Sequence, residues 1–153
     1  MFDTHVDTMY VWVAVGAVSV AVFGVVTQLP TSASPDGAAV ATTIDEVATS
    51  PSGSVTTREL TASDWSLTGR QVGLRSTGGT VHETLLRPAV PATAGRLRTV
   101  LDGTPPSAVY GSPAAFRQAT EAARTDGVQW RTAPDRMTVR RVVWGGVDVT
   151  LVG

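Results

Sequence analysis

The sequence holds few side chains that could act as bases, nucleophiles or metal ligands. It has no Cys and two His, His5 and His82, among 153 residues. The lack of Cys excludes a thiolate nucleophile, a disulfide and a thiolate metal site. Because His5 lies in a short tail far along the chain from His82, we expect no metal site built on histidine. For His82 we expect a solvent-facing position on a strand rather than the role of a catalytic base.

The other patterns that could do chemistry have simpler structural explanations. Ser112 stands in Gly-Ser-Pro rather than in the G-x-S-x-G elbow of hydrolases, and it is better placed to cap a helix. No G-x-G-x-x-G motif occurs, and a G-x-x-x-x-G-K-[ST] phosphate loop needs a Lys, which the chain lacks. Asp45 and Glu46 are adjacent, so on a helix their carboxylates diverge instead of forming an acid–base pair.

Three Trp side chains leave two interpretations open. Trp65, Trp130 and Trp144 could form a surface on which a ligand stacks, or they could anchor the hydrophobic core; their burial distinguishes the two. In a domain with so few aromatic residues, we expect core anchors. The sequence thus predicts a protein with no catalytic, cofactor-binding or metal-binding residues, and therefore one that is not an enzyme.

The charge distribution argues against a nucleic-acid partner. The formal net charge is −1, all 12 basic residues are Arg, and none precedes position 58. The arginines are scattered, apart from the pair Arg140 and Arg141. Binding to a phosphate backbone requires a basic stripe, which this pattern does not supply. The chain also has no Asn, so it offers no N-glycosylation acceptor.

An uncharged apolar run occupies residues 10–29. As an α-helix it would be about 30 Å long, close to the thickness of the hydrocarbon core of a bilayer, so we expect a transmembrane helix. Tyr10 and Trp12 are expected at the membrane interface at its start, and Pro30 at its other end. Two alternatives remain: a buried helix of a soluble domain, and a signal peptide cleaved near residues 31–33.

These features divide the chain into four parts. A tail over residues 1–9 precedes the transmembrane helix, a linker of turn-forming residues covers 30–36, and a soluble head covers 37–153. The head should begin with a helix capped by Asp36, on which Val40, Ile44 and Val47 form one apolar stripe. A strand is expected next, from Val55 to Leu60.

Two β-hairpins are expected in the head. A turn at Gly78-Gly79 would join two strands within residues 71–86 and would put His82 on their polar face. The apolar side chains of this hairpin would share the opposite face: Val72, Leu74, Val81 and Leu85. A turn at Gly145-Gly146 within residues 137–152 would align a second apolar set: Val142, Trp144, Val147, Val149 and Leu151.

Two further helices are expected between the hairpins. One covers residues 94–101 and ends at Asp102-Gly103; the other covers residues 113–125, with Ser112 as its N-cap and Pro113 at its first position. The second helix has a narrow apolar face: Phe116, Ala119 and Ala123. The predicted fold class is therefore α+β, with an N-terminal transmembrane helix followed by a small head of antiparallel hairpins and two or three short helices.

The two ends of the chain resemble an uncharacterised family of small haloarchaeal single-pass membrane proteins. The likeness rests on Phe2-Asp3, on residues 7–12, on Pro30 after the uncharged run, and on residues 143–144 and 147–152. Genes for such proteins often lie near genes for secretion-type and pilus-type assemblies.

More loosely, the plan of short tail, apolar helix and α+β head is similar to type IV pilins and pseudopilins. In those proteins the apolar helices bundle in the filament core and the heads face outward. This chain differs from them, because no basic leader ending in Gly precedes the apolar run and no acidic residue lies early in it. The differences argue against processing by a prepilin peptidase.

The resemblance implies a non-enzymatic, single-pass component of a pilus-like or secretion-like envelope assembly, in contact with the lipid bilayer and with other membrane proteins. The positive-inside rule does not assign an orientation, because no Lys or Arg lies near the span. The resemblance favours a head outside the cytoplasm. One alternative is a membrane-tethered binding or sensing domain that faces the cytoplasm, which a large apolar pocket or patch on the head would favour. Another is a tethered hydrolase, with His82 as its one candidate base. Neither the oligomeric state nor the identity of a partner follows from the sequence.

Overall fold

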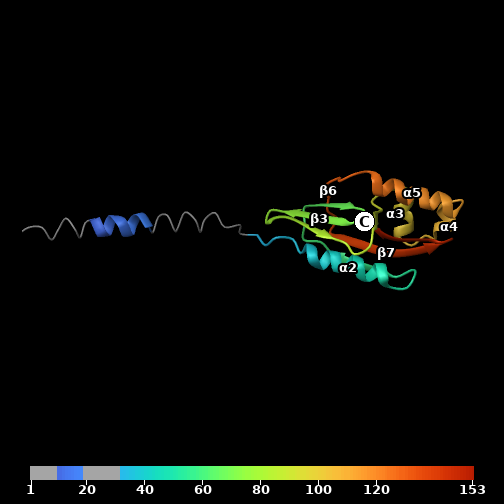
Figure 1. The fold of residues 1–153 in the computed structure, drawn as a ribbon, viewed down its shortest axis with the longest axis horizontal. Coiled ribbons are helices and arrows are strands. Elements are labelled where there is room, and N and C mark those ends of the chain that lie inside the picture. Colours follow the sequence, from blue (N-terminus) through green and yellow to red (C-terminus); the bar gives the residue numbers. More distant parts are fainter. Residues whose placement is uncertain (1–9, 19–31) are drawn as a thin grey trace, which may run out of the picture. The chain divides into compact units, whose positions relative to one another are not determined.

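Figure 1 shows the chain as a ribbon, in a computed structural model that describes residues 10–18 and 32–153. The chain divides into two compact units, Met1–Ser32 and Ala33–Gly153. The tail predicted over residues 1–9 lies outside the described residues, as do the first two residues of the predicted linker. All eight strands and the helices α2 to α5 belong to the second unit, which we call the head.

The prediction of a transmembrane helix over residues 10–29 is wrong. A helix occupies residues 10–18, and residues 19–29 lie outside the described part of the chain. Among the described residues, no helix is both long enough and apolar enough to cross a membrane. Crossing the hydrocarbon core takes about 20 helical residues, because each adds only about 1.5 Å of length. The fold class is therefore corrected to α+β, with no transmembrane helix within residues 10–18 and 32–153.

The head is built on two four-stranded sheets. Sheet A has the strand order β1 (Val55–Glu59), β7 (Arg136–Trp144), β8 (Val147–Val152) and β5 (Ala89–Pro91). Sheet B has the order β4 (Gly79–Thr84), β3 (Gln71–Ser76), β2 (Asp64–Thr68) and β6 (Arg131–Thr132). Neighbouring strands are antiparallel, as predicted, except that β5 runs parallel to β8.

The β7–β8 hairpin has the predicted turn and the predicted buried face. Trp144 pairs with Val147, which leaves Gly145 and Gly146 as a two-residue turn with φ angles of 53° and 78°. Two positive φ angles are typical of a type I′ turn, whose twist matches that of the flanking strands. The five apolar side chains expected on one face all pack in one core cluster: Val142, Trp144, Val147, Val149 and Leu151.

The β3–β4 hairpin turns one residue earlier than predicted. Ser76 pairs with Gly79, so the turn is Thr77-Gly78 and Gly79 belongs to β4. The Ser76 Oγ accepts a hydrogen bond from the Gly78 N–H at 3.1 Å, a local bond that favours this turn. Because the pairing shifts by an even number of residues, the faces are unchanged and His82 is exposed, as predicted. The apolar side chains still share the core face: Val72, Leu74, Val81 and Leu85.

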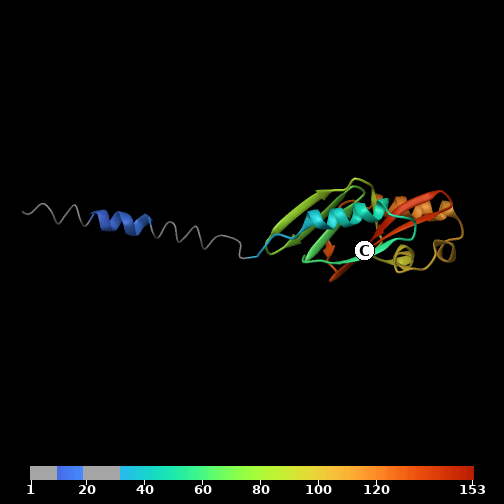
Figure 2. The ribbon, with the colours of Figure 1, turned by 90° about the horizontal axis from the view of Figure 1, so that it is seen from below.

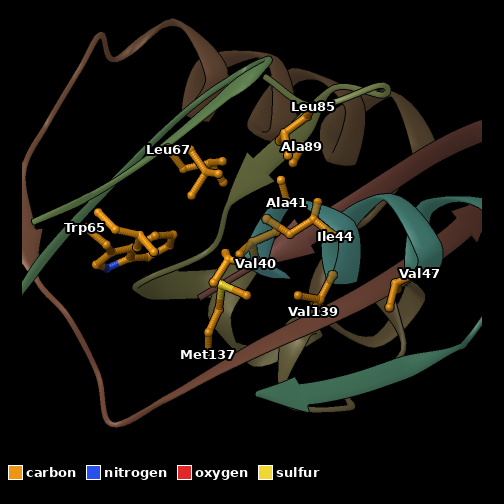
Figure 3. Close-up of a cluster of buried hydrophobic side chains, with 13 residues drawn as sticks. Val40, Ala41, Ile44, Val47, Trp65, Leu67, Leu85, Ala89, Met137 and Val139 are labelled. Carbon is orange, nitrogen blue, oxygen red and sulfur yellow. The ribbon is translucent and has the colours of Figure 1, made fainter. Parts of the chain in front are cut away.

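Helix α2 (Gly37–Thr49) contacts both sheets and closes the core between them (Figure 2). The Asp36 carboxylate caps it by accepting a hydrogen bond from the Ala39 N–H at 3.0 Å, as predicted. The predicted stripe of Val40, Ile44 and Val47 is buried. Figure 3 shows these side chains in a cluster with residues of β2 and β7: Trp65, Leu67, Met137 and Val139.

Three helices pack against a second cluster on the other face of sheet A: α3 (Gly95–Leu101), α4 (Pro106–Val109) and α5 (Pro113–Thr125). Helices α3 and α5 were predicted, whereas α4, a single turn, was not. The Ser112 Oγ caps α5 by accepting a hydrogen bond from the Ala115 N–H at 3.2 Å. Sheet A is thus buried on both faces, since Val139 of β7 packs toward α2 and Val142 of the same strand packs toward α5.

Candidate functional site

The helix of residues 10–18 presents apolar side chains at its surface. Tyr10 and Trp12, which were expected at a membrane interface, are 70% and 72% exposed, and Pro30 lies outside the described residues. Several valines are also more than half exposed, among them Val11, Val13 and Val18. Exposed apolar surface of this kind marks a site of association. The helix is therefore a candidate contact segment.

Two of the three Trp side chains of the head are core anchors, as expected. Trp65 on β2 is 3% exposed and packs with α2. Trp144 is half-buried at the end of β7, where its ring centroid lies 6.1 Å from that of Phe116. Trp130 occupies the segment between α5 and β6, away from both clusters. The three rings therefore do not form a common stacking surface.

Trp130 packs on the polar face of sheet B. The Arg75 guanidinium carbon lies 4.1 Å from the centroid of the indole, and the ring of His82 meets it edge-on with the centroids 5.7 Å apart. A Cβ atom at Gly73 would lie 3.0 Å from the outer edge of the indole, so glycine leaves the space that Trp130 fills. These contacts hold the segment after α5 against the sheet, which gives His82 a structural role beside Trp130.

A partly exposed ion pair joins the two strands of the C-terminal hairpin. Arg141 donates to Asp148 in the bidentate manner, from Nε to Oδ1 at 3.0 Å and from Nη2 to Oδ2 at 2.6 Å. Its third nitrogen, Nη1, donates to the Ser50 carbonyl at the end of α2. The hydrogen bonds from Arg141 hold the pKa of the Asp148 carboxyl below its usual value. The pair thereby fastens α2 to the hairpin.

Replacing Asp148 with Asn should destabilise the head at neutral pH and have little effect in strong acid. A carboxyl group whose pKa is lower in the folded than in the unfolded state stabilises the protein at pH values above its unfolded-state pKa, which is about 3.9 for Asp. This contribution is lost as the pH falls through the folded-state pKa. Because the Asp148 side chain is 45% exposed, we expect a loss of less than about 1 kcal/mol. Urea unfolding at neutral and at strongly acidic pH measures it.

The matched control is Asp102→Asn, which removes the exposed pair of Asp102 with Arg98 on α3. Pairs at this spacing contribute about 0.2–0.5 kcal/mol, so the control should change stability less than Asp148→Asn. A loss for Asp148→Asn that persists unchanged in acid would contradict the role given to its ionised form.

A cavity of about 280 Å³ lies beside β8, at the point where β5 begins. Strand β5 pairs with β8 only from Thr150 to Val152, so Asp148 and Val149 lie on the stretch of β8 before that pairing and line the cavity. Arg87, from the loop before β5, and Arg124, from the last turn of α5, complete its charged walls. We call this space the arginine cavity.

The two arginines of the cavity differ in their hydrogen bonding: the loop that carries Arg87 is held by backbone hydrogen bonds, whereas a buried nitrogen of Arg124 has no partner among the described residues. The Asp45 carboxylate of α2 accepts hydrogen bonds from the backbone N–H groups of Leu86 and Arg87 at 3.0–3.4 Å, which fixes the loop that carries Arg87. The Nε of Arg124 is buried and has no hydrogen-bond partner among the described residues. Buried polar groups are nearly always paired, so this nitrogen is an exception that calls for an explanation.

No metal centre is formed by the described residues, because nowhere among them do three or more His, Asp or Glu side chains gather as ligands. Sequence reasoning missed the arginine cavity. Its charged residues come from positions 87, 124 and 148 and follow no local spacing, so no motif could have signalled it.

In the comparison with known proteins, one family match covers both the N-terminal segment and most of the head. The model of a family of unknown function (DUF7283) matches residues 3–142, from the N-terminal tail to a point within β7. No curated protein and no solved structure matches the chain. The resemblance to an uncharacterised family is thus confirmed at that level. Since the match covers most of the sequence, the chain belongs to the DUF7283 family, whose function is unknown.

Proposed function

We propose that this protein is a non-enzymatic component of a pilus-like or secretion-like envelope assembly. It joins its partners through the apolar helix of residues 10–18 and through contacts of the head. The pilin-like plan, a haloarchaeal source and a head outside the cytoplasm belong to the same proposal.

The observation that carries the proposal is the apolar surface of the N-terminal helix. Tyr10 and Trp12 are each at least 70% exposed, and Val13 is 62% exposed. Burying such side chains contributes about 1.5–3 kcal/mol each, so a partner that covers the helix would gain considerable free energy. The family match begins at residue 3, so the segment is part of what defines the family.

The head supports a structural role in two ways. Its cores are filled by tightly buried side chains on both faces of sheet A, and five cavities lined by its described residues have volumes of about 160–280 Å³. Ligand pockets for drug-sized molecules usually have about 300–1,000 Å³. None of these five cavities is the large apolar pocket that would favour a sensing domain.

Val13→Asp should disrupt the assembly. A carboxylate placed in a covered apolar contact loses its hydration, which costs several kcal/mol unless it is paired. We expect recovery of partners with the tagged full-length protein, from envelopes dissolved in mild detergent, to fall about tenfold or more. Co-purification followed by mass spectrometry measures this.

The matched control is Val128→Asp, which makes the same change at a head residue with nearly the same exposure, 61% against 62% for Val13. It should leave recovery unchanged. Recovery of the unmodified protein as a lone monomer, or equal losses for the two variants, would count against the proposal. Protease added to intact cells tests the location, since an outward head should be digested and a cytoplasmic head should be protected.

A binding or sensing role is the second candidate, and the arginine cavity is the observation that favours it. The cavity is small and charged rather than large and apolar, so a ligand would be recognised there by charge.

A further inference from the structure

We propose that the arginine cavity binds an oxyanion, a phosphate or carboxylate group of a small molecule, through the guanidinium groups of Arg124 and Arg87. The inference goes beyond the assembly role and does not depend on it.

The charges around the cavity do not balance. The cavity is lined by Arg87, by Arg124 and by a single acidic residue, Asp148, whose carboxylate pairs with the neighbouring Arg141. Asp148 already accepts two hydrogen bonds from Arg141, at 3.0 and 2.6 Å, and Arg87 acts on it only electrostatically. The nearby carboxylate of Asp45 is occupied by backbone N–H groups. Arg87 and Arg124 therefore line the cavity without an ion pair of their own among the described residues.

Part of the unpaired positive charge is buried in the protein, on Arg124. Its Nε is buried and unpartnered within the described part of the chain, whereas arginines that serve only solubility keep their nitrogens in water. Taking a guanidinium nitrogen out of water without a partner is unfavourable, and an anion held by the rest of the group offsets that loss. The planar guanidinium presents donors that match the oxygens of phosphate and carboxylate.

The volume and lining of the cavity limit the size and polarity of the molecule that bears the oxyanion. A volume of about 280 Å³ exceeds the need of a bare ion but lies below the usual range for drug-sized ligands, about 300–1,000 Å³. Ala48, Pro88 and Val149 give it an apolar side, and Thr150 adds a hydroxyl-bearing side chain. A compact molecule with one anionic end and a short apolar body fits this lining.

Titration of the full-length protein with inorganic phosphate and, separately, with citrate tests the proposal. Ionic strength is held constant with chloride, and the Nε–H signal of Arg124 is followed by NMR. We expect a saturable shift of that signal with at least one of the two anions. Saturation by phosphate alone indicates a phosphorylated ligand, and saturation by citrate alone indicates a carboxylate ligand.

Variants separate the site from general charge effects. Arg87→Gln, at an exposed loop residue, should weaken the anion's binding by about tenfold or more, as should Arg124→Gln. Arg117→Gln removes the same charge from the exposed side of α5, outside the cavity, and should bind like the unmodified protein. If neither anion gives a saturable shift, or if Arg117→Gln weakens binding as much as Arg87→Gln, the proposal is wrong. Either failure leaves the Val13→Asp result, and hence the assembly proposal, untouched.

Discussion

Replacing Phe116 with Ala is expected to lower the free energy of unfolding of the head by about 3–5 kcal/mol. Phe116 on α5 is fully buried, and its ring contacts two other aromatic rings. The centroids of Tyr110 and Trp144 are 5.3 and 6.1 Å from its own. Truncation removes both aromatic contacts and leaves a cavity where α5 meets sheet A. Urea unfolding followed by circular dichroism measures the loss.

Gln118→Ala is the control for Phe116→Ala, because Gln118 lies on the exposed side of the same helix. Surface substitutions of this kind usually change stability by less than about 0.5 kcal/mol, and alanine is a good helix former. If Phe116→Ala cost no more than Gln118→Ala, α5 would not be anchored through Phe116 and the second core cluster would need another explanation.

Gly145→Ala should destabilise the head more than Gly146→Ala, although the two glycines share one turn. Both have positive φ angles, 53° and 78°, so alanine at either position costs about 1–2 kcal/mol of backbone strain. A Cβ at Gly145 would also lie only 2.2 Å from Cγ of Pro113 at the start of α5, whereas a Cβ at Gly146 meets nothing within 4 Å. Overpacking of this kind adds about 1–3 kcal/mol. Thermal unfolding of the two variants measures the difference.

The clash can be separated from the strain by a double-mutant cycle with Pro113→Gly. Removing the proline ring removes both atoms that a Cβ at Gly145 would meet most closely. The cost of Gly145→Ala should then fall to about that of Gly146→Ala. Costs that simply add in the double variant would show that the turn and α5 do not touch in solution.

Local patterns in the sequence were enough to predict most elements of the head. The cap at Asp36, the Ser112-Pro113 start of α5 and the Gly145-Gly146 turn all depend on residues within a few positions of one another. Alternation with a period of two assigned the faces of both hairpins, and this assignment survived even where the β3–β4 turn moved by one residue. In each case the bonds that decide the structure are short-range.

Other features could not be predicted because they depend on partners far away in the chain. Strand β5 is three residues long and includes Pro91, and it becomes a strand only by pairing in parallel with β8. Trp130 lies in an irregular segment and was expected in the core, but packing against Arg75 and His82 on sheet B gives it a different place. Composition also misled at the N-terminus, because hydropathy reports how apolar a run is, whereas crossing a membrane also requires a long apolar helix, and none is found among the described residues.

The sequence by itself determined that the head is α+β, where its caps and hairpins lie, and that no thiol or lysine chemistry is available. Only the tertiary structure decided that sheet A is covered on both faces, that β5 stops short along β8, and that Arg87 and Arg124 both line the space left there. The physical reason is the distance along the chain between the residues that interact. Capping and turn geometry depend on neighbours in the chain, whereas the cavity depends on the packing of segments that the sequence keeps apart.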